Sequence, residues 1–312
     1  MSVVPEPVQQ PVQRPFERHE ILLAERALAY RHAPSADTAA PAAVFLHGLG
    51  GSALNWTDLM GRMRSRLDCY AIDLHGFGAS PPPRDGDMSP AGHARAVADF
   101  IAEHELGPVH VFGNSLGGAI SLQLAARRPE LVRSLTLVSP ALPNLRYATK
   151  GNVHLPVISV PGIGERLIPK FVETTTPEQR VQATIDGTFA DPSRMSELRF
   201  AEAVEEVRAR DARPYAHDAF LQSLRGLLRT YFDRSANRPW KLAERVQAPT
   251  LLVYGRKDPL VDSRTAHRAT KHFADAHVVV LPDSGHVAQM EHPEFVEAAW
   301  DRFIAPSISP AR

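Results

Sequence analysis

Residues 109–128 read VHVFGNSLGGAISLQLAARR: a short apolar run, a glycine-rich turn and a stretch rich in Ala and Leu. This pattern predicts a strand at Val109–Gly113 and a helix at Leu116–Arg128, joined by a G-x-S-x-G turn around Ser115. Glycines on both sides of the serine let the backbone turn sharply without a Cβ clash. The turn places Ser115 above a helix N-terminus, whose amides favour developing negative charge. An ordinary βα turn with a serine near the helix start can have the same sequence. The assignment of Ser115 as a nucleophile therefore depends on finding a base and an acid for it.

Similar units recur along the chain and predict an α/β fold, because short apolar strands between helices form a mostly parallel, doubly wound sheet of about eight strands. Such strands are buried on both faces and therefore lack polar alternation. Ser89 and Pro90 are a plausible N-cap and first-turn pair for one of the helices. The expected strands are 19–23, 27–32, 42–47, 67–73, 109–113, 131–139, 249–255 and 277–281, and the expected helices are 88–105, 116–128, 265–273 and 293–304.

The pattern changes between the two halves of this sheet, where proline-rich turns and charged helical stretches replace the strands. We expect a helical insertion there, with helices near 195–210 and 219–231. The predicted organisation is a disordered or loosely docked arm at 1–18, a core at 19–141, a helical insertion at 142–238 and a second part of the core at 239–312.

Serine needs a neighbouring base, and the imidazole needs a carboxylate to fix its tautomer. Of 14 histidines, His286 stands in Ser-Gly-His after the last predicted strand, at the same sheet edge as Ser115. Asp258 follows the strand TLLVYG and can reach across to His286, in the order Ser, Asp, His. Asp262 and Asp283 are the competing acids.

The sequence HGLGG follows the strand AAVFL and can aim a backbone amide at the same point as the serine turn. We therefore expect the amides of Leu49 and Leu116 to form an oxyanion hole. His47 is interpreted as a structural residue. These glycines do not form a phosphate loop, because the Lys-Ser/Thr ending is absent.

Composition narrows the partners and the location. Lys+Arg and Asp+Glu are 35 each, so the net charge gives no reason to expect nucleic acid or an anionic membrane as a partner. The single cysteine, Cys69, lies in an apolar run and is expected to be buried. No long apolar run predicts a membrane span and the N-terminus does not resemble a signal peptide, so we expect a cytoplasmic protein.

The stretches HGLGGS, DLHGFGAS, GNSLGG, YGRKDPLV and SGHVAQMEHPE together resemble the α/β-hydrolase superfamily over nearly the whole chain after residue 18. The resemblance implies that fold, a triad of Ser115, Asp258 and His286, and a helical cap at 142–238 that roofs the site. It also implies a structural loop beginning at Asp73, in which His75 replaces the usual Arg.

Within the superfamily, Ser115 argues against epoxide hydrolases and haloalkane dehalogenases, which have Asp at that position. Asn114 resembles the carbon–carbon bond hydrolases of ring-cleavage products, but their loop usually reads GGGPG where this chain has HGLGGS. The leading hypothesis is an esterase acting on a small or medium apolar acyl substrate without metal or organic cofactor. The alternatives are a carbon–carbon hydrolase and a non-catalytic ligand-binding protein.

The insertion holds apolar residues that either line the substrate pocket or pack the insertion onto the core, and the sequence favours neither reading. They are Leu155, Val157, Ile158, Val160, Ile163, Leu167 and Ile168.

Overall fold

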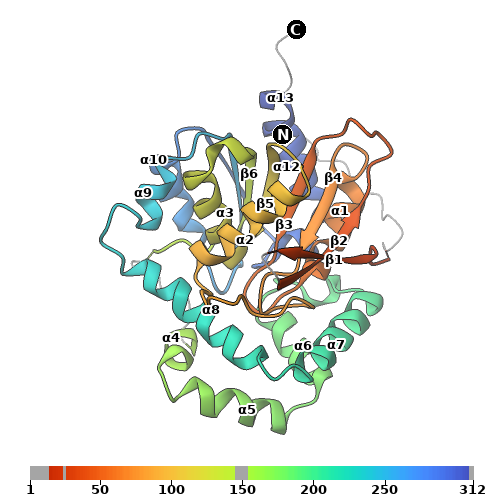
Figure 1. Cartoon of the computed structure of the whole chain (residues 1–312), viewed down its shortest axis with the longest axis vertical. Coiled ribbons are helices and arrows are strands. Elements are labelled where there is room, and N and C mark those ends of the chain that lie inside the picture. The colour runs from red at the N-terminus through yellow and green to blue at the C-terminus, as the bar shows by residue number, and fades with distance from the viewer. Residues whose placement is uncertain (1–13, 24–25, 145–153, 309–312) are drawn as a thin grey trace.

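One eight-stranded sheet organises the computed structural model, which describes residues 14–23, 26–144 and 154–308 (Figure 1). The strand order is β1-β2-β4-β3-β5-β6-β7-β8. The predicted strands are confirmed, with each end shifted by at most one residue. Their bounds are β1 Arg18–Leu23, β2 Arg26–Ala33, β3 Ala42–Leu46, β4 Asp68–Ile72, β5 Val109–Asn114, β6 Val132–Val138, β7 Thr250–Gly255 and β8 Ala276–Leu281.

The sheet is antiparallel at one edge and parallel elsewhere. β1 pairs with β2, and β2 with β4, in antiparallel fashion, while all pairs from β4 to β8 are parallel. The chain runs from β3 outward to β4 and then returns across β3 to β5, so the strand order reverses between β3 and β5. Loops after these two strands diverge at that point, which is where open α/β sheets bind ligands.

Helices cover both faces because the parallel strands are apolar on both sides. In β3, Val44 and Leu46 join the core under α2, α3, α9 and α10, whereas Ala43 and Phe45 join the core under α1 and α12. The bounds are α1 Thr57–Met63, α2 Pro90–Glu103, α3 Leu116–Arg127, α9 Pro239–Ala243, α10 Ala266–His272, α11 Ala288–Glu291, α12 Pro293–Phe303 and α13 Ala305–Ile308.

Five further helices lie between β6 and β7, in the segment predicted to be a helical insertion, and gather at one end of the sheet (Figure 1). We call them the inserted helices. Two of them, α6 and α7, share a small core with the loop that joins them, formed by Val181, Ile185, Phe189, Val204 and Val207. Their bounds are α4 His154–Ser159, α5 Gly164–Thr174, α6 Pro177–Asp186, α7 Glu197–Asp211 and α8 Ala216–Tyr231.

Local expectations met different outcomes. The hydroxyl of Ser89 caps α2 by accepting a hydrogen bond from the Gly92 amide, as predicted. Cys69 is fully buried, also as predicted.

Helix α1 was not predicted, since it is only seven residues long and contains Gly61. Residues 1–13 of the predicted arm lie outside the described residues, and Arg18 already belongs to β1.

No helix in the described part of the chain is both long enough and apolar enough to cross a membrane.

Candidate active site

Ser115 occupies a strained turn between β5 and α3. Its backbone has φ 52° and ψ −114°, a left-handed region that costs a non-glycine residue energy and is common at active sites. The turn is held from both sides, because the Ser115 amide donates to the Val138 carbonyl at 3.1 Å and its carbonyl accepts from the Ala141 amide at 2.9 Å. A Cβ on Gly117 would lie 2.1 Å from the Leu46 carbonyl oxygen, so only glycine fits there.

His286 and Asp258 form a buried pair at the same end of the sheet. Nδ1 of the imidazole lies 2.9 Å and 3.1 Å from the two carboxylate oxygens of Asp258. The amides of Leu260 and Val261 donate to the same carboxylate at 2.8 Å and 2.9 Å. Burial alone would raise the pKa of Asp258, but His286, the Val261 amide and the Ser139 hydroxyl together hold that pKa below its usual range. The acid is therefore charged and fixed in place.

The two competing acids are engaged elsewhere. Asp262 caps a short 3-10 helix and pairs with Arg264 at 2.5 Å. Asp283 is exposed and pairs with Lys257 at 2.8 Å. Of the three candidate acids, only Asp258 contacts the ring of His286.

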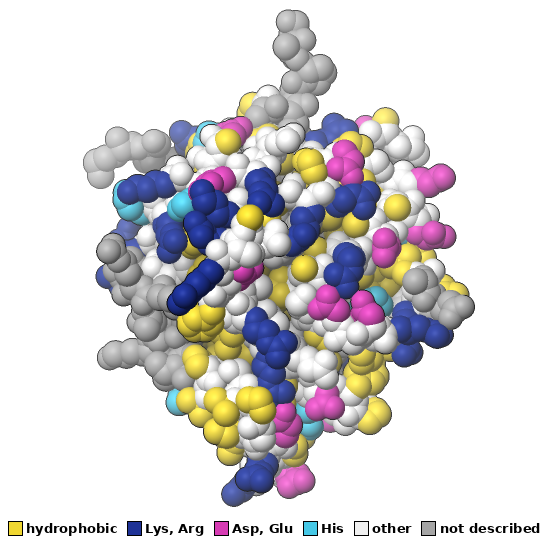
Figure 2. Space-filling view, turned by 60° about the vertical axis from the view of Figure 1, so that its left-hand side comes forward, with side chains coloured by type: hydrophobic (Ala, Val, Ile, Leu, Met, Phe, Trp, Pro, Cys, Tyr) yellow, Lys and Arg dark blue, Asp and Glu magenta, His cyan; other side chains and the backbone are white. Residues whose placement is uncertain are grey.

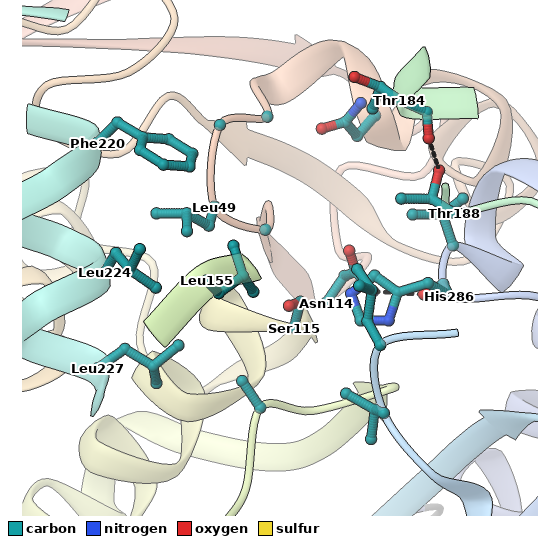
Figure 3. A pocket seen from close by; sticks show the side chains of 18 of the residues that line it. Leu49, Asn114, Ser115, Leu155, Thr184, Thr188, Phe220, Leu224, Leu227 and His286 are labelled. Carbon is teal, nitrogen blue, oxygen red and sulfur yellow. Dashed lines mark hydrogen bonds between the residues drawn. The ribbon is translucent and has the colours of Figure 1, made fainter. Parts of the chain in front are cut away.

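Ser115 and His286 line the same pocket, and Figure 3 shows them side by side. Their loops are tied together through Asn114, whose side-chain amide donates to the carbonyls of both Val138 and His286 at 3.0 Å. The described residues include no hydrogen bond between the Ser115 hydroxyl and the imidazole. Catalytic hydrogen bonds of this kind often tighten only when substrate is present.

The HGLGG loop passes beside the serine. A Cβ placed on Gly48 would lie 3.3 Å from the Ser115 Cβ, so the two loops are in contact. Within the described part of the chain, neither the Leu49 amide nor the Leu116 amide donates to a protein acceptor. Both predicted oxyanion donors therefore keep an unused N–H next to Ser115.

His47 has a structural role. Its Nε2 accepts from the Leu74 amide at 3.0 Å, which leaves Nδ1 to donate to the Gly48 carbonyl at 2.7 Å. Burial lowers the pKa of His47 to about 4, so the ring is neutral and fixed in this tautomer. It therefore braces the loop that carries Leu49.

Asp73 holds two of the loops near the site together. Its carboxylate accepts from the amides of Ala53 and Ala79 at 2.7 Å and 2.9 Å. A Cβ on Gly78 would lie 2.0 Å from the Asp73 Cγ, which explains the glycine in this loop. Asp73 links the start of the helix after β3 to the loop after β4, and it does not line the pocket.

The pocket above Ser115 has a volume of about 700 Å³ and is lined by the core loops and the inserted helices. Leu49, Leu155, Phe220, Leu224 and Leu227 form an apolar wall (Figure 3). Another wall comes from α7 and carries charged side chains, namely Arg199, Glu202, Glu206 and Arg210. The pocket therefore suits a molecule that is mainly apolar and has a polar portion.

Of the seven apolar residues singled out in the insertion, only Leu155 meets the pocket-lining expectation. Leu155 lines the pocket, but Val157, Val160 and Leu167 are 50%, 46% and 47% exposed. Ile163 is exposed as well, whereas Ile158 and Ile168 are half-buried. The part of Figure 2 that holds the inserted helices shows hydrophobic side chains at the surface. The rest of the pocket lining that the insertion contributes comes mainly from α6, α7 and α8.

Comparison with known proteins settles the family. A family model described as the alpha/beta hydrolase fold matches residues 41–293. The chain belongs to the α/β-hydrolase fold family. An esterase of Mycobacterium tuberculosis is 29% identical to this α/β hydrolase over 265 residues, covering 81% of the chain and 79% of the esterase.

A second relative is the 2-hydroxy-6-oxo-6-(2'-aminophenyl)hexa-2,4-dienoic acid hydrolase of Metapseudomonas resinovorans, 26% identical over 267 residues, covering 80% of this α/β hydrolase and 79% of the relative. The crystal structure of Cfl2 from Burkholderia cenocepacia superposes with a TM-score of 0.77 at 20% identity and covers 95% of this chain and 98% of its own. That last similarity concerns the fold alone.

Two parts of the site were not found from the sequence. The Asn114 side-chain amide donates to the His286 carbonyl, and the His286 amide donates to the Thr188 carbonyl; both acceptors are main-chain carbonyls, which leave no signal in side-chain types. Glu291 is a buried carboxylate beside the His286 loop. In the sequence it stands two residues before Pro293, so it is easily taken for an ordinary residue at the start of a helix. Among the described residues, no cluster of three or more His, Cys, Asp and Glu side chains is arranged to bind a metal ion.

Proposed function

We propose that this α/β hydrolase is a serine esterase that cleaves a carboxylic ester through an acyl-enzyme on Ser115. The observation that carries the proposal is the buried His286–Asp258 pair beside the strained Ser115 turn. Because Asp258 occupies Nδ1 of the imidazole, Nε2 is the nitrogen that can take the proton from the serine hydroxyl.

The reaction proceeds in two halves. The Ser115 oxygen attacks the carbonyl carbon as His286 takes its proton, and the same proton is then returned to the leaving alcohol. Water, activated by His286, releases the acid and restores the serine. The unused amides of Leu49 and Leu116 stabilise the oxyanion in both halves, each worth about 3–4 kcal/mol of barrier.

The inserted helices act in this proposal as a cap that selects the acyl group. The apolar wall with Phe220, Leu224 and Leu227 favours a small or medium apolar acyl chain. The similarity to a mycobacterial esterase supports ester cleavage as the reaction.

The test uses a fluorophosphonate probe and a series of p-nitrophenyl esters of increasing acyl length. Wild-type protein should be labelled and should turn over the esters, whereas Ser115→Ala should lose labelling and about 10⁶ in kcat. Undiminished turnover by Ser115→Ala would end the proposal, and equal rates across acyl lengths would contradict the apolar acyl preference.

Carbon–carbon hydrolysis is the second candidate, favoured by Asn114 before the nucleophile and by the similarity to a dienoic acid hydrolase. It predicts consumption of a coloured ring-cleavage product with poor ester turnover. A non-catalytic receptor would instead bind a ligand with negligible turnover of either substrate.

A further inference from the structure

Glu291 lies at the end of α11 with 1% of its surface exposed, although it carries a carboxylate. We propose that Glu291 is a positioning residue that locks the His286 loop to the segment 188–191, whose first two residues line the pocket. The inference deepens the proposed esterase function and rests on it, because Glu291 acts through His286 and does not touch substrate.

The two carboxylate oxygens of Glu291 bind two different segments. Oε2 accepts from the Gly285 amide at 2.7 Å and from the Ser284 hydroxyl at 3.4 Å. Oε1 accepts from the amides of Ala190 and Asp191 at 2.9 Å and 2.8 Å. One side chain therefore bridges the residue before His286 and the chain between α6 and α7.

The bridged segments are already in direct contact. The His286 amide donates to the Thr188 carbonyl at 2.6 Å, and Thr188 and Phe189 line the pocket. A Cβ on Gly285 would lie 2.3 Å from the Thr188 carbonyl oxygen and 2.6 Å from the Ala190 nitrogen. The two backbones are therefore packed directly against each other, with no side chain between them. The Glu291 carboxylate binds both and so fixes their relative position.

The donor set explains why a carboxylate is needed. The donors to Glu291 are main-chain amides and one hydroxyl, and the described residues place no cation within ion-pair distance of it. Glutamine has the same shape but offers only one oxygen. Its NH₂ group would then face N–H donors on one of the two segments, leaving them buried and unpaired.

The experiment compares Glu291→Gln with Glu294→Gln as a matched control. Glu294, on the neighbouring helix α12, pairs with Arg194 at 2.9 Å and with His292 at 3.6 Å, and none of its described ion pairs or hydrogen bonds reaches residues 284–286. We expect Glu291→Gln to lower kcat on p-nitrophenyl esters about 10- to 100-fold, since small misplacements of a reacting group have effects of this size. KM should change less, because the apolar wall from α8 is untouched, and Glu294→Gln should stay within about twofold of wild type in kcat.

A double-mutant cycle separates positioning from a merely structural role. In the His286→Ala background, Glu291→Gln should produce no further loss of residual rate per folded protein, because the group it positions is absent. A purely structural role would lower the rate by the same factor in both backgrounds. Urea unfolding and circular dichroism give the folded fraction of each variant.

Each outcome bears on one claim. If Ser115→Ala behaves as expected but Glu291→Gln matches Glu294→Gln, the positioning role is wrong and the esterase proposal survives. If Ser115→Ala keeps full turnover, the esterase proposal fails first. Glu291→Asp keeps the charge and is measured in the same cycle. Failure of both Glu291 variants to fold would overturn the proposal, because Glu291 would then be required for folding itself.

Discussion

The side-chain amide of Asn114 donates a hydrogen bond to the main-chain carbonyl of His286 at 3.0 Å, which joins the nucleophile turn directly to the histidine loop. The same amide reaches the carbonyl of Val138 at 3.0 Å, at the end of the neighbouring strand. The residue before the serine therefore determines where the base lies, without touching the imidazole ring.

Replacement of Asn114 by Asp should reduce activity strongly. A carboxylate would face two carbonyl oxygens in a buried site, so both acceptors would lose their donor and repel the new charge. We expect kcat to fall at least 100-fold and the urea midpoint to drop. Steady-state kinetics and urea unfolding measure both effects, and an Asn114→Asp protein with wild-type kcat would show that this link is unimportant.

Asp258→Asn should lower kcat about 10⁴-fold while the fold is retained, because the amide would favour the wrong imidazole tautomer. Asp283→Asn is the control, since Asp283 is exposed and pairs only with Lys257 at 2.8 Å among the described ion pairs. Ester turnover by the two variants decides the assignment of the acid. Equal losses in both variants would contradict it.

Leu227→Trp should shorten the acyl chain that the pocket accepts. Leu227 is buried and belongs to the apolar wall, so a larger side chain fills space that a longer acyl group needs. We expect kcat/KM for p-nitrophenyl octanoate to fall about tenfold, equivalent to about 1.4 kcal/mol, with the acetate ester little changed. Leu167→Trp on the exposed face of α5 is the control and should leave the ratio of the two rates unaltered.

Stability should fall as the pH drops below about 6.5, the ordinary histidine pKa. Burial lowers the pKa of His47 to about 4, of His93 to about 3 and of His110 to about 4. These rings stay neutral in the folded protein but take up protons in the unfolded chain. The unfolded state therefore binds more protons, and its free energy falls relative to that of the folded state as the pH drops. Each ring should cost about 2 kcal/mol between pH 8 and pH 5.

Urea unfolding at several pH values checks this prediction. His93→Gln should reduce the loss of unfolding free energy between pH 8 and pH 5 by about 2 kcal/mol. His267→Gln, which changes an exposed histidine, is the control and should reduce this loss far less. A stability that rises on acidification through this range would contradict the argument.

The sequence sufficed for features that depend on local chemistry. The sharp turn at Ser115 requires glycines within a few residues of the serine. The strands are apolar because both of their faces are buried. Asp258 could be favoured over Asp262 because the end of a strand fixes where its loop starts. These signals lie in neighbouring residues, so they need no knowledge of the packing.

The inserted helices were less predictable, for a physical reason. An apolar residue lowers its free energy against any apolar surface, so composition does not say whether Leu155 or Val160 faces the pocket. The structure turns Leu155 inward and leaves Val160 exposed. The role proposed for Glu291 was equally hidden, because its donors are mainly main-chain amides, which every residue except proline carries.

The hydrogen bond from the His286 amide to the Thr188 carbonyl restricts how the pocket can open. If the segment at Thr188 swung away to admit substrate, it would remove an acceptor from the histidine backbone and disturb the imidazole. If His286 is to keep its position while substrate enters and product leaves, another part of the pocket wall must move.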